Sequence, residues 1–166
     1  MKIYHGALAA VEEPRIIKVD RVGDFGIGFY TTTDIEQARR FVVRKCGITG
    51  ADRGVVSSYE VPDDVLTSAA LHVKRFDGPI EDWVKFVFAN RRAALFEHGF
   101  DLVFGPVAND QVYASLALFE DGQIGPEELI RRLRSRKLTN QLLFHTAKAL
   151  ALLRYVGGTE VVCPVR

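Results

Sequence analysis

The chain has 166 residues, of which 48% are hydrophobic and 26% charged, and its formal net charge at pH 7 is +1. This length predicts a single domain over residues 1–166, and the small charge excludes a protein whose main role is to coat nucleic acid. No apolar run is long enough to cross a bilayer and Met1 begins no secretory pattern, so we expect a cytoplasmic protein without membrane association. Cys46 and Cys163 match no metal or redox spacing and are expected to be buried or unremarkable thiols in a reducing compartment.

The first half of the chain contains short extended segments and one clear helix. Residues 2–7, KIYHGA, mix β-branched and aromatic side chains, which indicates a strand. Residues 8–28 carry a proline and several glycines without a sustained period and predict a long loop, a feature that is commonly functional or disordered. GFYTTT resumes an extended path, and Asp34 is a candidate N-cap for a helix over residues 35–46. Two further strands are expected at residues 55–61 and 71–76.

The second half is richer in helices. Apolar residues at helical spacing predict four of them, at residues 79–96, 109–122, 125–136 and 146–154. Short apolar runs predict strands at residues 100–107, 140–145 and 159–165. Many connections between strands lack a helix, so we expect an α+β fold in which mostly antiparallel sheets pack together with helices at their edges.

Several familiar active-site motifs are missing from the sequence. It has no P-loop, no G-x-G-x-x-G that opens a helix after a strand, no H-E-x-x-H and no G-x-S-x-G. A Rossmann enzyme or a serine hydrolase is therefore disfavoured.

Three stretches nevertheless occur in a suggestive order: YHGA, FGIGFYTTTDIEQARRF and NQLLFH. Together they resemble the motifs of ADP-ribosyltransferases of the diphtheria toxin and poly(ADP-ribose) polymerase type. In that family a first-strand His-Gly, a later G-x-G-x-Y and a Glu at the start of a third strand line an NAD cleft. The resemblance implies a split β-sandwich with flanking helices and an NAD cleft, and a His-Tyr-Gln variant in which Gln141 stands where the family has Glu.

The resemblance assigns roles to individual residues. His5 would bond ribose hydroxyls, and the backbone of Gly6, which has no Cβ, would approach the nicotinamide amide. Tyr30 would stack on the cationic nicotinamide ring, and Phe41 would add a second ring. Gln141 keeps the hydrogen-bonding geometry of Glu but loses its charge, which implies weaker catalysis, transfer of single ADP-ribose units, or lost activity.

NAD is thus the implied co-substrate, and no metal is implied. Lys18 and Arg21 in the long first loop are candidates to hold its pyrophosphate, and Asn90 and Arg91 are possible groove residues. His145 is a candidate for an extra polar group further along the cleft, because it shares a strand side with Gln141. The arginine-rich helices are expected to be solvated surfaces, and the alternatives are that they hold the NAD pyrophosphate, dock an acidic antitoxin or guide a nucleic acid.

The whole chain, including DWVKFVFANRR, GPVAND and NQLLFHTAKAL, also resembles a bacterial family allied to these transferases, some of whose members look like toxins of toxin–antitoxin pairs. The implied function is an NAD-dependent mono-ADP-ribosyltransferase, the toxin of a toxin–antitoxin or phage-defence module, acting on a protein or nucleic-acid acceptor. The alternatives are a non-catalytic module that binds NAD or ADP-ribose, and a partner-binding protein.

Each candidate residue also has a purely structural interpretation. His5 alone is more typical of a structural histidine, and Tyr30 with Phe41 is typical of core aromatics. Asn109 and Asp110 suit a helix cap, and His98 is expected at the surface.

Overall fold

The computed structural model describes residues 1–166 except 18–22, 93–97, 109, 136–137 and 165–166. The strands are β1 (Lys2–Ala7), β2 (Phe29–Thr32), β3 (Arg53–Glu60), β4 (Val73–Arg75), β5 (Leu102–Pro106), β6 (Asn140–Phe144) and β7 (Arg154–Val162). The helices are α1 (Ile35–Thr49), α2 (Glu81–Arg92), α3 (Asp110–Glu120), α4 (Pro126–Arg134) and α5 (Ala147–Leu150). Within the described ranges no helix is long and apolar enough to cross a membrane, and no three His, Cys, Asp or Glu side chains group as metal ligands.

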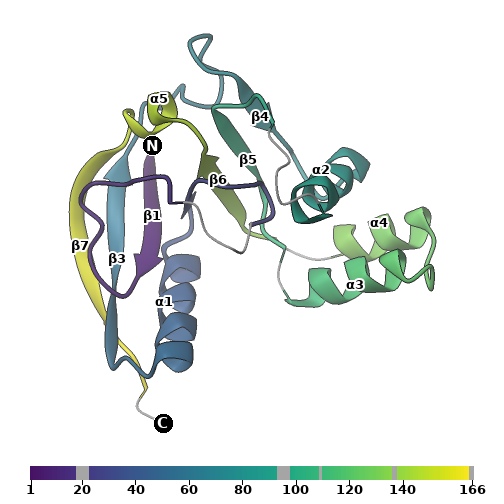
Figure 1. The fold of residues 1–166 in the computed structure, drawn as a ribbon, viewed down its shortest axis with the longest axis horizontal. Coiled ribbons are helices and arrows are strands. Elements are labelled where there is room, and N and C mark those ends of the chain that lie inside the picture. Colours follow the sequence, from purple (N-terminus) through teal and green to yellow (C-terminus); the bar gives the residue numbers. More distant parts are fainter. Residues whose placement is uncertain (18–22, 93–97, 109, 136–137, 165–166) are drawn as a thin grey trace.

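The strands form one seven-stranded sheet in the order β4-β5-β6-β2-β1-β3-β7 (Figure 1). β4 and β5 are parallel, and the other neighbouring pairs are antiparallel. The α+β class and the mostly antiparallel pairing are confirmed. The expectation of separate sheets packed together is wrong, because β2 pairs with β6 on one side and with β1 on the other. The contact between β2 and β1 is narrow, with Tyr4 and Thr32 as its paired residues.

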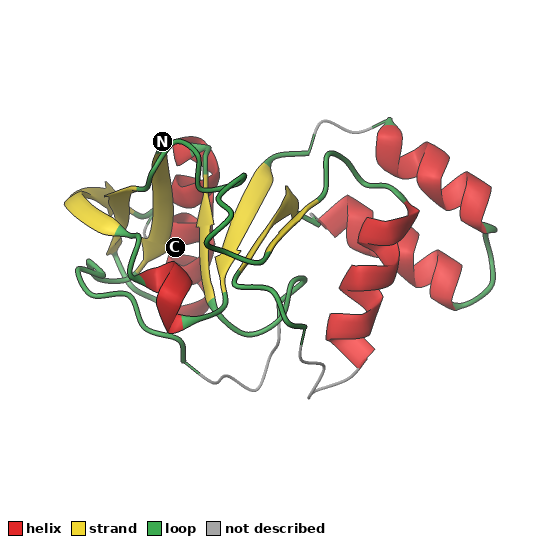
Figure 2. Ribbon diagram, turned by 90° about the horizontal axis from the view of Figure 1, so that it is seen from above, coloured by secondary structure: helices red, strands yellow, loops and turns green. Residues whose placement is uncertain are grey.

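The helices cover the sheet in two groups. α1 packs against β1 and β3, where Ala38, Val42 and Val56 form a small core. α2, α3 and α4 gather beside β4, β5 and β6, well away from α1 (Figure 2), and Trp83 and Leu143 belong to the core there. This second group of helices lies beside the strand that carries Gln141.

Local signals define α1, although its end differs from the prediction. Asp34 is the N-cap as expected, because its carboxylate accepts from the Glu36 N–H at 2.9 Å. The helix continues through Gly47 to Thr49, beyond the predicted boundary. It ends at Gly50, whose φ of +76° suits a residue without a Cβ and whose N–H donates to the Cys46 carbonyl at 2.8 Å.

The C-terminal segment differs most from the sequence-based expectation. The predicted helix over residues 146–154 shrinks to the single turn of α5, and the predicted strand begins earlier, as β7. β7 pairs antiparallel along the whole length of β3, with one irregularity between Ser58 and Tyr59. The alanines and leucines lie in α5 and in the turn that follows it, and β7, which contains neither residue type, begins only at Arg154.

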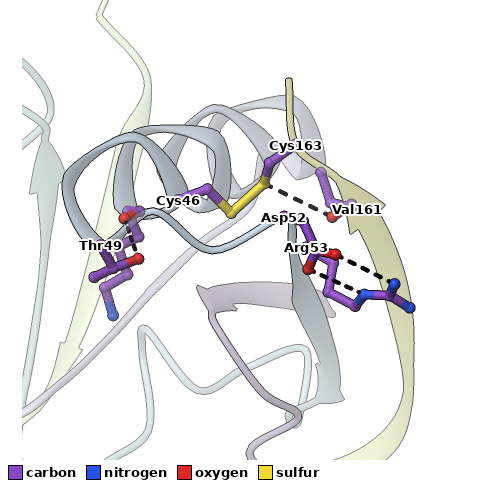
Figure 3. Close-up of a disulfide and its surroundings, with 7 residues drawn as sticks. Cys46, Thr49, Asp52, Arg53, Val161 and Cys163 are labelled. Carbon is purple, nitrogen blue, oxygen red and sulfur yellow. Dashed lines mark hydrogen bonds and ion pairs between the residues drawn. A yellow bond between two sulfur atoms is a disulfide. The ribbon is translucent and has the colours of Figure 1, made fainter. Parts of the chain in front are cut away.

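The two cysteines are joined, which corrects the prediction of separate thiols. Cys46 in the last turn of α1 forms a disulfide with Cys163, which follows β7, and their Cα atoms are 6.3 Å apart (Figure 3). The Cys163 N–H also donates to the Asp52 carbonyl at 2.8 Å. The prediction failed because spacing alone did not show that α1 ends beside the end of β7.

Candidate functional site

The turn before β2 folds back over the hydroxyl of Tyr30. The Gly26 N–H donates to the Gly23 carbonyl at 3.1 Å and closes the turn. The Tyr30 hydroxyl accepts from the Phe25 N–H at 3.0 Å and donates to the Gly26 carbonyl at 2.7 Å. A Cβ on Gly23 would lie 2.4 Å from this hydroxyl, and Gly26 has a φ of +104°, so both positions favour glycine. Burial raises the pKa of Tyr30, so the hydroxyl stays protonated and holds the turn.

Asp24 in the same turn is a carboxylate that is only 6% exposed. Its Oδ1 accepts from the Tyr113 hydroxyl of α3 at 2.8 Å, and its Oδ2 accepts from the Ala108 N–H at 3.3 Å. Burial raises the pKa of Asp24, while the bonds from Tyr113 and Ala108 and the nearby Arg91 guanidinium act in the opposite direction. Asp24 therefore links the turn to α3 and to the segment that follows β5.

Gln141 lies on β6, opposite Thr32 of β2 and Gly105 of β5. It shares a sheet face with Tyr30, because Tyr30 and Thr32 are two positions apart on one strand. Its side chain is 8% exposed, and its Nε2 has no hydrogen-bond partner among the described residues. The amide is near enough to Asp24 to lower the pKa of that carboxyl, although the two groups lack the geometry of a formed hydrogen bond. The buried Gln141 amide donor therefore lies near the Asp24 carboxylate without a formed hydrogen bond.

Two residues of α2 border the same turn. The Asn90 Nδ2 donates to the Phe86 carbonyl at 2.8 Å, and its Oδ1 is so close to Gly26 that a Cβ there would lie 2.9 Å away. The Arg91 guanidinium lies over the Tyr113 ring, 4.2 Å from its centroid. The structure thus places Asn90 beside the turn before β2 and Arg91 beside Tyr113 of α3, and their role in a cofactor groove stays a prediction. The residues around the buried carboxylate are called the Asp24 cluster below: Asp24, Tyr30, Arg91, Tyr113 and Gln141.

The His5 side chain lies on the opposite face of the sheet. Its Nδ1–H donates to the Tyr30 carbonyl at 2.7 Å, and its ring packs on Phe29 with centroids 4.4 Å apart. Phe29 and Tyr30 are consecutive strand residues, so their side chains point to opposite faces. The strands that carry His5, Tyr30 and Gln141 are neighbours, but the His5 ring is separated from the other two side chains.

Gly6 has a clear packing role. A Cβ at this position would lie 2.5 Å from the Ala38 carbonyl oxygen of α1, so glycine lets the helix approach β1 closely. Contact between the Gly6 backbone and nicotinamide stays a prediction.

The other predicted cofactor residues are not gathered here. Phe41 on α1 is 44% exposed, with the Lys45 Nζ 5.1 Å from its ring centroid, and the described contacts do not join it to Tyr30. The structural interpretation of Phe41 as a core aromatic is wrong, because Phe41 lies outside the core that Ala38 and Val42 form. The predictions for Lys18 and Arg21, and the capping prediction for Asn109, lie outside the described residues.

Two histidines hold the other side of the turn. The His145 Nδ1–H donates to the Ile27 carbonyl, and its ring centroid is 4.3 Å from that of His98. His98 is buried and its Nε2–H donates to the Phe25 carbonyl at 2.7 Å, so the prediction of a surface position was wrong. His145 is thus placed beside the turn, and its role as an extra polar group further along the cleft stays a prediction.

Sequence reasoning missed the central members of this arrangement. Asp24 directly precedes the recognised glycine motif, and an acidic residue next to such a motif was the available signal. Tyr113 had no comparable signal, because its partner lies 89 residues away in the chain.

The arginine-rich helices are partly paired with carboxylates. Arg40 lies 3.4 Å from Asp34, and Glu128 binds both Arg131 and Arg132. Such exposed pairs add little stability, and they offset much of the local positive charge. The interpretation as solvated surface fits these contacts, and docking of an antitoxin or nucleic acid there stays a prediction.

We expect His5 to make the fold less stable as the pH falls below its ordinary pKa of about 6.5. Burial lowers the pKa of His5 in the folded state, so the folded protein binds fewer protons than the unfolded chain in this window. Stability therefore rises with pH there and is lost on acidification. Urea unfolding at about pH 7.5 and about pH 5 checks this, and the loss should be smaller in His5→Gln.

The parent supplies the reference for this comparison. Burial also lowers the pKa of His98, which gives a slope of the same sign in both proteins, so the difference between them reports His5. Equal losses in parent and variant would show that the His5 ring is not effectively buried.

A family model described as "Protein of unknown function (DUF3990)" matches residues 1–155, and the chain belongs to this family. The matched range includes the whole Asp24 cluster. No curated protein and no solved structure gives a significant match. The family description states no activity, so function must be inferred from the site.

Proposed function

We propose that the chain is an NAD-dependent mono-ADP-ribosyltransferase-like protein that transfers ADP-ribose to a macromolecular target and releases nicotinamide. The main support is the meeting of β1, β2 and β6, which carry His5, Tyr30 and Gln141, as consecutive strands in the middle of the sheet. These segments are far apart in the sequence, and their adjacency agrees with the resemblance to transferases of the diphtheria toxin and poly(ADP-ribose) polymerase type. The narrow contact between β1 and β2 is also compatible with the split sheet of that class.

The chemistry requires positioning and charge stabilisation. Cleavage of the bond between nicotinamide and ribose passes through a state with oxocarbenium character, as in glycoside hydrolysis. In this proposal the Tyr30 ring stacks on the cationic nicotinamide, and the Gln141 amide bonds a ribose hydroxyl near the reacting carbon. His5 positions β2 through its bond to the Tyr30 carbonyl, in place of the ribose contact that the resemblance implies.

The biological setting that we propose is the toxin of a toxin–antitoxin or phage-defence module, with a protein or nucleic-acid acceptor. Its support is the resemblance to a bacterial family with toxin-like members. A cytoplasmic location belongs to the same proposal, but the Cys46–Cys163 disulfide points the other way, because such bonds are rare in reducing compartments.

Nicotinamide release from NAD tests the activity. We expect release by the purified protein to rise when cell extract supplies an acceptor. Gln141→Ala should lower the rate by about 100-fold or more, the usual effect of removing a group that stabilises the transition state. The matched control is Gln123→Ala at an exposed position, which should leave the rate unchanged. Equal rates for Gln141→Ala and the parent would exclude the proposed role of Gln141.

A non-catalytic module that binds NAD or ADP-ribose is the second candidate. Two observations favour it: Gln141 carries no charge, and the His5 ring lies on the face opposite to Tyr30. This candidate predicts that NAD raises the melting temperature without nicotinamide release. A partner-binding protein without a nucleotide site would show neither effect.

A further inference from the structure

The Asp24 carboxylate has no part in the chemistry described so far, yet its burial is costly. Removing a carboxylate from water is strongly unfavourable unless hydrogen bonds or opposite charges compensate. Asp24 accepts from the Tyr113 hydroxyl and the Ala108 N–H, and within the described part of the chain no salt bridge joins it to a cation. The cost of this burial is offset most readily where the negative charge of the carboxylate contributes to binding or catalysis.

The hydrogen-bonding chemistry of Asp24 and Gln141 determines which atom of the Gln141 amide points to the carboxylate. An ionised carboxylate can only accept hydrogen bonds, so the Gln141 Nε2 must be the atom that faces it. The Gln141 Oε1 is then turned away and becomes the acceptor that faces a ligand. This is the same type of atom that a glutamate at this position would offer to a ribose hydroxyl.

Location supports this pairing. The Ala108 N–H holds Asp24 just beyond the end of β5, and β5 pairs with β6 so that Gly105 lies opposite Gln141. The carboxylate is therefore fixed beside the start of β6. The side chains whose charge or hydrogen-bonding groups act on Asp24 come from four elements: Tyr30 of β2, Arg91 of α2, Tyr113 of α3 and Gln141 of β6.

We propose that Asp24 is a positioning residue for the ribose, which acts through Gln141. It supplies the negative charge that Gln141 lacks and fixes the amide so that Oε1 accepts from the ribose hydroxyl. This inference rests on the proposed transferase function. In this arrangement Asp24, in the turn before β2, carries the negative charge that a glutamate on β6 would carry.

Asp24→Asn separates the charge of Asp24 from its structural contacts. Asn can keep both links, since its oxygen accepts from the Ala108 N–H and its amide donates to the Tyr113 hydroxyl. We expect this variant to lower kcat for nicotinamide release by about tenfold or more while KM for NAD changes by less than about threefold. Unchanged kcat in a folded Asp24→Asn protein would overturn the proposal.

A second substitution tests whether the charge can be returned. Adding Gln141→Glu to Asp24→Asn restores one carboxylate, and most of the lost kcat should return. Gln141→Glu alone places two carboxylates together, which raises one of their pKa values and should shift the acidic limb of the pH–rate profile upward. A double variant no faster than Asp24→Asn would contradict the transfer of charge.

A readout without NAD separates this inference from the proposed function. In ¹H–¹⁵N spectra of the NAD-free protein, the Gln141 side-chain amide is assigned by its loss in Gln141→Ala. Its shift should follow pH in the parent and not in Asp24→Asn. Nicotinamide release without this titration would overturn the role of Asp24 and keep the transferase. Titration without release in any extract would exclude the transferase and retain only the pairing of Asp24 with Gln141.

Discussion

Reduction of the Cys46–Cys163 disulfide is expected to lower the free energy of unfolding by about 2–5 kcal/mol. The bond joins residues separated by 117 positions, and the loss of unfolded-chain entropy grows with the length of the closed loop. It fixes the last turn of α1 to the segment after β7 (Figure 3), so reduction also removes the covalent link between this helix and the edge strand of the sheet. Urea unfolding with and without reductant measures the difference.

A double variant provides the control for this experiment. Cys46→Ser with Cys163→Ser should match the reduced parent and show no response to reductant. A parent whose midpoint is equal under both conditions, after reductant has exposed two thiols, would contradict the expected stabilisation. The result also bears on location, because a bond that contributes this much is useful only in a compartment that lets it form.

The sequence predicted those parts of the fold that depend on neighbouring residues. Asp34 caps α1 because its carboxylate reaches an N–H two residues away, and this contact is visible in the sequence. Errors arose where the conformation of a segment depends on pairing with a strand that is distant in the sequence. The last strand was predicted to begin at residue 159, but pairing with β3 extends β7 back to Arg154, through two glycines that do not favour a strand locally. The single sheet was missed for the same reason, since β2 is joined to β6 across more than half of the chain.

The candidate site, like the fold, was predicted only where the sequence carries a local motif. The order of the motifs led to Tyr30 and Gln141, and the structure places both on one face of adjacent strands. No local pattern connects Asp24 with Tyr113, because their contact exists only after α3 has docked on the turn. The face occupied by the His5 ring was not predicted, because a motif indicates a position in a strand and not the environment of its side chain, and the ribose contact of His5 stays a prediction.

The site therefore depends on how firmly α2 and α3 are held against the sheet. α2 carries Asn90 and Arg91, and α3 carries Tyr113, and the fully buried Phe25 of the turn shares a core with both helices. Trp83, near the start of α2, is fully buried, and its Nε1–H donates to the Pro106 carbonyl at the end of β5 at 3.2 Å. This contact anchors α2 to β5, whose other neighbour, β6, carries Gln141.

Truncation of this anchor should have a large effect on stability. Trp83→Ala removes the whole indole from the core and leaves the Pro106 carbonyl without its donor, so we expect the free energy of unfolding to fall by about 3–5 kcal/mol. Urea unfolding measures the loss. Ile48→Ala is the control, because that side chain is 75% exposed on α1 and its removal should change stability by less than about 0.5 kcal/mol. Trp83→Phe should fall between the two, since a ring remains but the hydrogen bond is lost. Similar losses for Trp83→Ala and Ile48→Ala would mean that α2 is not anchored through the indole.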